Sequence, residues 1–137
     1  MTLEGLKPGT TSESSLMVDE GRTAAHLGSG TLRVFATPAM VLLVEDTCRR
    51  MVEPYLADGE STVGVSLKVR HLAPTPMGQM VRCRAEVAGV EGVVITFRAE
   101  VWDPSEKIGE AEHKRVVIEV DRFLRRVEAK AGGASAG

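Results

Sequence analysis

The chain has 137 residues, the length of one ordinary domain, which can bury a sizeable core without help from a disulfide or a metal. Its 17 basic and 19 acidic side chains give a formal net charge of -2, and such a balance offers no electrostatic footprint for nucleic acid. No stretch approaches the roughly 20 apolar residues of a membrane span, and the N-terminal segment lacks the pattern of a secretory signal. We therefore expect a cytoplasmic protein that binds a small molecule or another protein, with Cys48 and Cys83 reduced.

The first strong structural pattern is a helix that begins near residue 37. Before it, residues 14–19 suit a short strand and the glycine-rich stretch 21–30 suits a loop. Thr37 followed by Pro38 predicts an N-cap with proline at the first helical position, and apolar residues then recur at helical spacing. Because the first half of this helix is apolar almost all round, we expect neighbouring elements to cover most of it.

After the helix the apolar period changes from 3.6 to 2, which predicts strands. The alternating apolar residues predicted to share one face of the first strand are Val63, Val65, Leu67 and Val69. The next two strands form a hairpin around Glu91-Gly92, and a turn at 103–105 leads into a last strand at about 107–120. In that last strand the apolar parity switches near Arg115, which predicts a bulge there.

The order of these elements predicts an α+β fold in which an antiparallel sheet wraps a central helix. We expect one domain at 1–123, a short helix at 121–131, and a helix end with a flexible tail over 124–137. Long alternating strands leave open sheet edges, and pairing with a second subunit would cover one of them.

Glu45 is the first candidate functional residue, because it follows five consecutive apolar residues and lies on an otherwise apolar stripe of the helix. A carboxylate there is costly unless it has a partner or a function. The alternative is a surface glutamate paired with Arg49 at i+4, beside an Asp46–Arg50 pair. The helix pattern alone leaves both interpretations open.

Three further residues are functional candidates: Thr37 on the same helix, and His71 and Gly64 on the strand that follows. His71 continues the apolar parity of its strand, although a lone histidine of this kind is more often a satisfied core residue than a catalyst. Thr37 suits an N-cap, yet it stands eight residues before Glu45, near the same helix face, where helix-end N–H groups can stabilise an oxyanion. Gly64 marks either a bulge or a place where a substrate carbonyl approaches a backbone N–H.

Other chemistries receive little support from the sequence. The HLGSG motif at 26–30 lacks the flanking strand and helix of a phosphate loop. The three histidines and two cysteines show no metal-ligand spacing, so we expect no metal site.

Several motifs taken together resemble the fluoroacetyl-CoA thioesterase family of hot-dog proteins. They are VFAT at 34–37, Glu45 eight residues later, EPYLADGE at 53–60, Gly64, and HLAPTPMG at 71–78. The likeness covers roughly residues 26–123 without a gap in the spacing. It implies a hot-dog fold and a homodimer, or a dimer of dimers, with active sites at the subunit interface.

The resemblance also implies roles for individual residues. Thr37, Glu45 and His71 match the catalytic residues of the family. Gly64 matches a glycine that offers its backbone N–H near the thioester carbonyl, and Arg115 matches an arginine that lines the pocket. The implied activity is hydrolysis of a small or short-chain acyl-CoA, with no cofactor apart from the CoA of the substrate.

Two departures from the family pattern bear on the acyl group. Thr31 stands where a lid phenylalanine would align, in a shortened segment, and Pro38 replaces a glycine. These changes argue against fluoroacetyl-CoA as the substrate, though not against thioester hydrolysis.

Some alternatives stay open at this point. A hot-dog hydratase or dehydratase would share the fold, and a non-catalytic acyl-CoA-binding module would not need the three catalytic residues together. The outward basic residues of the strands are expected to form a solvated face, some of which could meet the phosphates of coenzyme A. They include Lys68, Arg70, Arg82 and Arg84.

Overall fold

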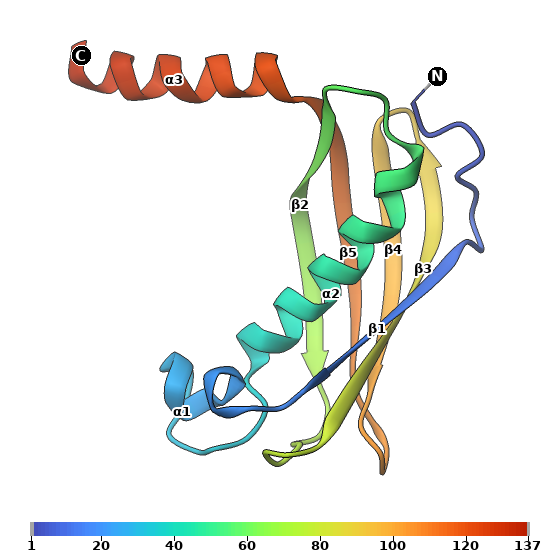
Figure 1. Cartoon of the computed structure of the whole chain (residues 1–137), viewed down its shortest axis with the longest axis vertical. Helices are drawn as coiled ribbons and strands as arrows, with labels where there is room; N and C mark the ends of the chain where they lie inside the picture. The colour runs from blue at the N-terminus through green and yellow to red at the C-terminus, as the bar shows by residue number, and fades with distance from the viewer. Residues whose placement is uncertain (1, 137) are drawn as a thin grey trace.

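A five-stranded antiparallel sheet packs against one long helix in the computed structural model, which describes residues 2–136 (Figure 1). In chain order the elements are β1 (Thr11–Met17), the 3-10 helix η1 (Glu20–Arg22), α1 (Ala24–Leu27), α2 (Thr37–Val52), the 3-10 helix η2 (Glu53–Tyr55), β2 (Glu60–His71), β3 (Met80–Glu91), β4 (Val94–Trp102), β5 (Lys107–Glu119) and α3 (Val120–Ala136). The strand order is β1-β3-β4-β5-β2, so β1 and β2 are the edges of the sheet. The predicted α+β architecture with a central helix is confirmed.

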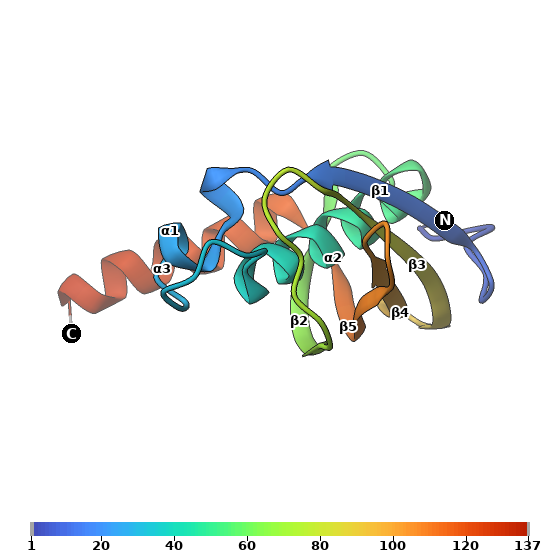
Figure 2. The same cartoon turned by 90° about the horizontal axis from the view of Figure 1, so that it is seen from below.

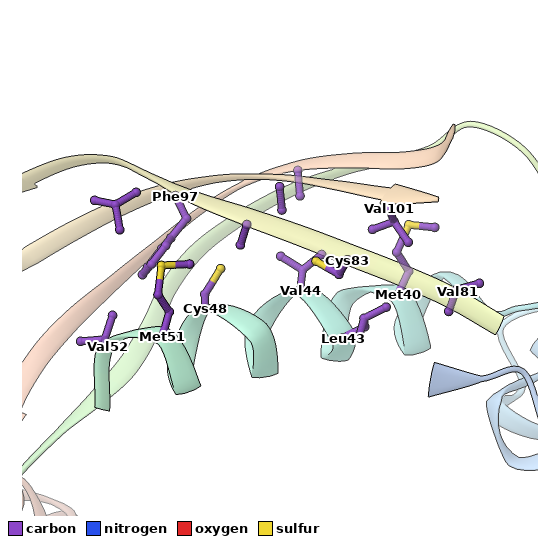
Figure 3. Packing of buried hydrophobic residues seen from close by; sticks show 14 of the residues in the cluster. Met40, Leu43, Val44, Cys48, Met51, Val52, Val81, Cys83, Phe97 and Val101 are labelled. Carbon is purple, nitrogen blue, oxygen red and sulfur yellow. The ribbon is translucent and has the colours of Figure 1, made fainter. Parts of the chain in front are cut away.

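The core lies between α2 and the concave face of the sheet (Figure 2). Met40, Val44 and Cys48 recur every four residues along α2 and are fully buried. In Figure 3 they point toward side chains of β3 and β4, among them Phe97 and Val101. Burying each such aliphatic side chain contributes about 1.5–3 kcal/mol, which holds the helix against the sheet.

The strand β2 contains a bulge that changes which residues face α2. Its register with β5 shifts between Gly64 and Ser66, leaving Val65 as the extra residue with 55% of its surface exposed. The grouping of Val63 and Val65 on the core face with the later apolar residues is therefore wrong. Beyond the bulge, the inward direction predicted for His71 is confirmed by its contact with Thr37 on α2.

The bulge predicted in the last strand near Arg115 is also wrong. The pairing of β5 with β4 runs without interruption from Val116 to Gly109. The inward residues of β5 stay in phase and include two polar ones, His113 and Arg115, both buried. The parity seems to switch because two polar residues, His113 and Arg115, occupy inner positions, while the apolar Val116 and Ile118 lie on the outer face.

The turns that connect the strands follow the sequence prediction. The reversal after β3 contains Gly92 at φ +61°, in the left-handed region that favours glycine. After β4, the Asp103 side chain accepts hydrogen bonds from the backbone N–H groups of Ser105 and Glu106 and so closes the second turn. The first strand begins earlier than expected, at Thr11.

The C-terminal helix α3 is longer than predicted and projects away from the sheet (Figure 1). The domain boundary at 123 and the flexible tail stay predictions, and Gly137 lies outside the described residues. Within residues 2–136, no helix combines the length and the apolar content needed to cross a membrane. Cys48 and Cys83 are free thiols in the core.

Candidate active site

Thr37 lies at the first residue of α2 and faces the end of β2. The N-cap is Ala36, not Thr37 as predicted, and the cap has no side-chain hydrogen bond. The Thr37 hydroxyl is instead 2.8 Å from Nδ1 of His71. This pairing follows from the strand, because the inner face of β2 beyond its bulge ends in His71 directly beside the helix N-terminus.

His71 presents one engaged and one free ring nitrogen. Its Nε2 is buried and has no hydrogen-bond partner within the described part of the chain. Phe35 contacts the ring edge-on, with centroids 6.3 Å apart. Burial lowers the pKa of His71, so the ring is neutral at neutral pH and can accept a proton. A buried polar atom without a partner marks a place where a further group is expected.

A hollow of about 380 Å³ opens beside the Thr37–His71 pair. Its other lining residues are Ala24, Ser29, Val34, Phe35, Leu72, Ala73 and Pro74. The first backbone bond of α2 runs from Met40 N–H to the Ala36 carbonyl, so the preceding N–H groups have no acceptor within the helix. Together with the helix dipole, these donors favour negative charge at this end of the hollow.

Glu45 belongs to a second cluster, two turns further along α2. A Cβ built on Gly64 would lie 3.1 Å from Glu45 Oε2 and 3.5 Å from Arg115 Nη1. Glycine at this position thus leaves the space in which the carboxylate and the guanidinium approach the bulge of β2. The carboxylate is half-buried, and no residue that the structure describes forms a hydrogen bond or ion pair with it.

Arg115 is held by two hydrogen bonds to Thr62. Its Nε donates to the Thr62 hydroxyl at 2.9 Å and its Nη2 to the Thr62 carbonyl at 3.0 Å. Burial lowers the pKa of Arg115, while the negative charge of Glu45 raises it. The guanidinium therefore offers a fixed positive charge beside the Glu45 carboxylate.

His113 is a further member of this cluster and was not among the predicted site residues. Its Nδ1 is 2.8 Å from the Ser66 carbonyl, which can only accept, so Nδ1 carries the proton. Nε2 then accepts from Arg115 Nη1 at 3.2 Å. Burial lowers the pKa of His113, and the Arg115 charge adds to this effect. The sequence signal for His113 is its spacing from Arg115 in EHKR (112–115), because residues two apart in a strand point to the same face.

The structure does not bring all the predicted catalytic residues into one contact group. Thr37 and His71 form one pair, while Glu45 Oε2 and Arg115 Nη1 both lie next to Gly64. Eight residues of helix separate the two groups by about 12 Å along α2. The alternative Glu45–Arg49 pair is not formed, because Arg49 pairs with Asp46 at 2.8 Å and with Glu53.

The predicted Asp46–Arg50 pair is confirmed, at 3.1 Å. A larger hollow, of about 500 Å³, lies on the outer face of the sheet, away from both clusters. It is lined by charged side chains such as Arg70 and Lys107, which pair with Glu110 and Glu100. The outward direction of the basic strand residues is thus confirmed. Among residues 2–136, no group of three potential ligands is placed to hold a metal ion.

Comparison with known proteins agrees with this architecture. The model of the family described as fluoroacetyl-CoA-specific thioesterase matches residues 18–121. The fluoroacetyl-CoA thioesterase of Streptantibioticus cattleyicolor is 34% identical over 133 residues, covering 93% of this chain and 96% of that protein.

Solved structures support the same assignment. One of a fluoroacetyl-CoA thioesterase superposes with a TM-score of 0.87 at 34% identity, over 92% of this chain and 98% of the other. A thioesterase superfamily member from Thermus thermophilus gives a TM-score of 0.88 at 24% identity, over 95% and 96%, which shows the fold alone. The predicted hot-dog fold is confirmed, and the chain belongs to the fluoroacetyl-CoA-specific thioesterase family.

Proposed function

We propose that this protein is an acyl-CoA thioesterase that hydrolyses small or short-chain acyl-CoA thioesters to the free acid and CoA. Family membership supports the reaction class. The observation that carries the proposal is the Thr37–His71 hydrogen bond at the N-terminus of α2, with a buried, unpartnered Nε2 on the same ring. Relatives of this family have been solved with fluoroacetate and CoA, and with acetyl-CoA.

A homodimer would complete the site. The edge strand β2 is 12 residues long, ends at His71, and carries the exposed Val65. Antiparallel pairing of β2 with the same strand of a second subunit is compatible with a two-fold axis and would cover this edge. A register that sets His71 opposite the partner's Gly64 brings the partner's Glu45 and Arg115 toward Thr37 and His71. The 12 Å gap within one chain would then be closed across the interface.

In the proposed mechanism the thioester carbonyl lies at the N-terminus of α2, where helix-end N–H groups and the Gly64 N–H stabilise the oxyanion. Glu45 either attacks the carbonyl carbon or removes a proton from the attacking water. The C–S bond breaks and the CoA sulfur leaves as a thiolate that takes up a proton. When Glu45 acts as the base, this is the proton taken from water and passed on through His71. When Glu45 attacks, water then hydrolyses the acyl–Glu45 anhydride to the free acid and supplies the proton. Thr37 holds the His71 ring in place, and Arg115 sets a positive charge near the Glu45 carboxylate.

A thiol-release assay over a panel of acyl-CoAs tests the activity and separates the thioesterase from a non-catalytic acyl-CoA-binding module. Release of CoA at a rate that saturates with acetyl-CoA or another short acyl-CoA is the expected result. Binding without release would refute the enzyme. Single-turnover hydrolysis in labelled water distinguishes the two roles of Glu45, since only the nucleophilic route leaves label in its carboxylate.

We also propose a cytoplasmic location, because both cysteines are free and buried and no disulfide is needed for stability. No resident cofactor or metal takes part in the proposed reaction. Nucleic acid is an unsuitable partner for a chain of net charge -2. The proposed assembly is a dimer or a dimer of dimers. The outward basic residues of the sheet are candidates for contact with the CoA phosphates.

A further inference from the structure

The helix α3 leaves the body of the protein and carries apolar side chains into solvent. It runs over 17 residues, about 25 Å, and its first backbone N–H donates to the Gly59 carbonyl at the start of β2. In both cartoon views it extends past the β2 edge, on the side opposite β1 (Figures 1 and 2). Its direction is therefore toward the space that a subunit paired through β2 would occupy.

The apolar residues of α3 form one stripe. Phe123, Leu124 and Val127 have the spacing i, i+1, i+4, and 39%, 47% and 48% of their surfaces are exposed. Arg122 and Arg125 lie on the opposite side of the helix by the same periodicity. A helix with one apolar face and one basic face, held to the domain only at its base, is typical of an element that packs on another surface.

A second group of exposed apolar side chains lies on the segments that line the Thr37–His71 hollow. Leu72, which lines the hollow, is 45% exposed. Leu27, at the end of α1, is 45% exposed, and Leu32, whose carbonyl accepts the Ala25 N–H of the same helix, is 68% exposed. Leu72 lines the hollow itself, and the other two leucines belong to the segment that supplies Ala24, Ser29 and Val34 to its wall, so a complementary apolar face could cover all three.

The topology of the sheet determines where these two groups would meet. The base of α3 lies at the Glu60 end of β2, since Glu60 pairs with Glu119. The hollow lies at the other end, beside His71, roughly 35 Å away along the strand. Antiparallel pairing of two β2 strands sets the Glu60 end of one subunit against the His71 end of its partner. With His71 opposite the partner's Gly64, Glu60 is level with the partner's Thr75, so each α3 starts near the partner's segment 72–76, which includes Leu72.

We propose that α3 is an arm that crosses to a second copy of the chain and covers the entrance of the partner's Thr37–His71 hollow. The stripe of Phe123, Leu124 and Val127 packs on the leucines around that entrance. The aromatic ring of Phe123 thus lies at the acyl end of the site, where the shortened segment around Thr31 has no aromatic residue. The inference rests on the dimer in the proposed function and adds a second, reciprocal contact to it.

Engineered disulfides test this contact. In the double variant Leu72→Cys with Phe123→Cys, oxidation is expected to give a covalent dimer that reductant reverses. The two positions are too far apart within one chain to join, and the native thiols do not compete, since burial raises the pKa of Cys83 to about 11 and that of Cys48 still further. The matched control, Leu72→Cys with Arg125→Cys, places the second thiol on the opposite face of α3 and should give at least about tenfold less covalent dimer. All three replaced positions are exposed, so each variant is expected to fold.

Light scattering of the unmodified protein and the thiol-release assay accompany the cross-linking. A protein that is a dimer and hydrolyses acyl-CoA, but whose double variant with Phe123→Cys cross-links no better than the control, overturns the arm and leaves the proposed function intact. A monomer overturns the arm together with the shared site. Preferential cross-linking in a protein without thioesterase activity would support the arm while refuting the proposed function.

Discussion

Replacing Glu45 by glutamine removes its charge with almost no change in volume. The two atoms that lie 3.1 and 3.5 Å from the Gly64 Cβ position place Glu45 Oε2 at most about 6.6 Å from Arg115 Nη1. At an effective dielectric constant of about 20, opposite charges at that distance attract by about 2.5 kcal/mol. Part of this attraction is offset by the cost of desolvating the half-buried carboxylate. We therefore expect Glu45→Gln to lower the free energy of unfolding by about 1–2 kcal/mol.

The effect on turnover should be much larger than the effect on stability. A glutamine amide can neither attack the thioester nor accept a proton from water, and loss of such a group typically costs 10²–10⁴-fold. The assay is release of the CoA thiol from acetyl-CoA, with kcat and KM measured separately. Urea unfolding of the same preparations gives the change in stability and shows that the variant is folded.

Asp46→Asn is the matched control, because it removes the same charge one residue further along the same helix. Asp46 pairs with Arg49 and Arg50 at the surface, where such pairs contribute about 0–1 kcal/mol. The Asp46→Asn variant should keep nearly full turnover. Undiminished kcat in Glu45→Gln, or equal losses in both variants, would refute the role assigned to the Glu45 carboxylate.

Four further outcomes are expected. Thr37→Val should cost about 1 kcal/mol of stability and about 10² in turnover by releasing the His71 ring, while Thr37→Ser, which keeps the hydroxyl, should retain most of both in the same assays. Gly64→Ala should lower kcat by about tenfold, since its Cβ must displace Glu45 Oε2 and the His113 ring, and an unchanged kcat would contradict the close approach. The folded-state pKa values of His71 and His113 both lie below the ordinary 6.5, so the unfolded chain binds more protons than the folded one once the pH drops below about 6.5. Urea unfolding should therefore show that the free energy of unfolding decreases as the pH is lowered from 7.5 to 5. The decrease should be smaller in His113→Gln. Specificity constants for acetyl-CoA and fluoroacetyl-CoA should agree within about tenfold, because a single fluorine needs dedicated contacts to be recognised, and a preference of several orders of magnitude would show that such contacts exist without the lid phenylalanine.

The fold could be predicted from the sequence because its signals are strong and local. The change of apolar period after residue 58 separates the helix from the strands, and the turns at Gly92 and Asp103 use residues whose local chemistry specifies a reversal. The sequence predicts a shorter helix than α3, because the second half of α3 contains glycines and small residues, whose helix propensity is a weak guide.

The detailed geometry of the site was less accessible. The N-cap is Ala36 and not the predicted Thr37. The Thr37 hydroxyl bonds instead to His71, a residue 34 positions away that no local pattern connects to it. His113 was overlooked because a histidine flanked by charged residues looks exposed in sequence, while its place on the inner face depends on pairing with β4. Such long-range partners decide which of several local options a residue adopts.

The bulge at Val65 explains why both clusters can face the helix. Gly64 and His71 are seven residues apart, an odd number, so in an unbroken strand they would point to opposite faces. One extra residue restores the phase, and the Ser66 carbonyl just beyond the bulge accepts the Nδ1–H of His113. That ring in turn accepts from Arg115, so a single irregularity in β2 both turns His71 inward and orients the charge beside Glu45. Prediction from alternation assumes a regular strand, so it assigns residues on one side of the bulge to the wrong face of β2.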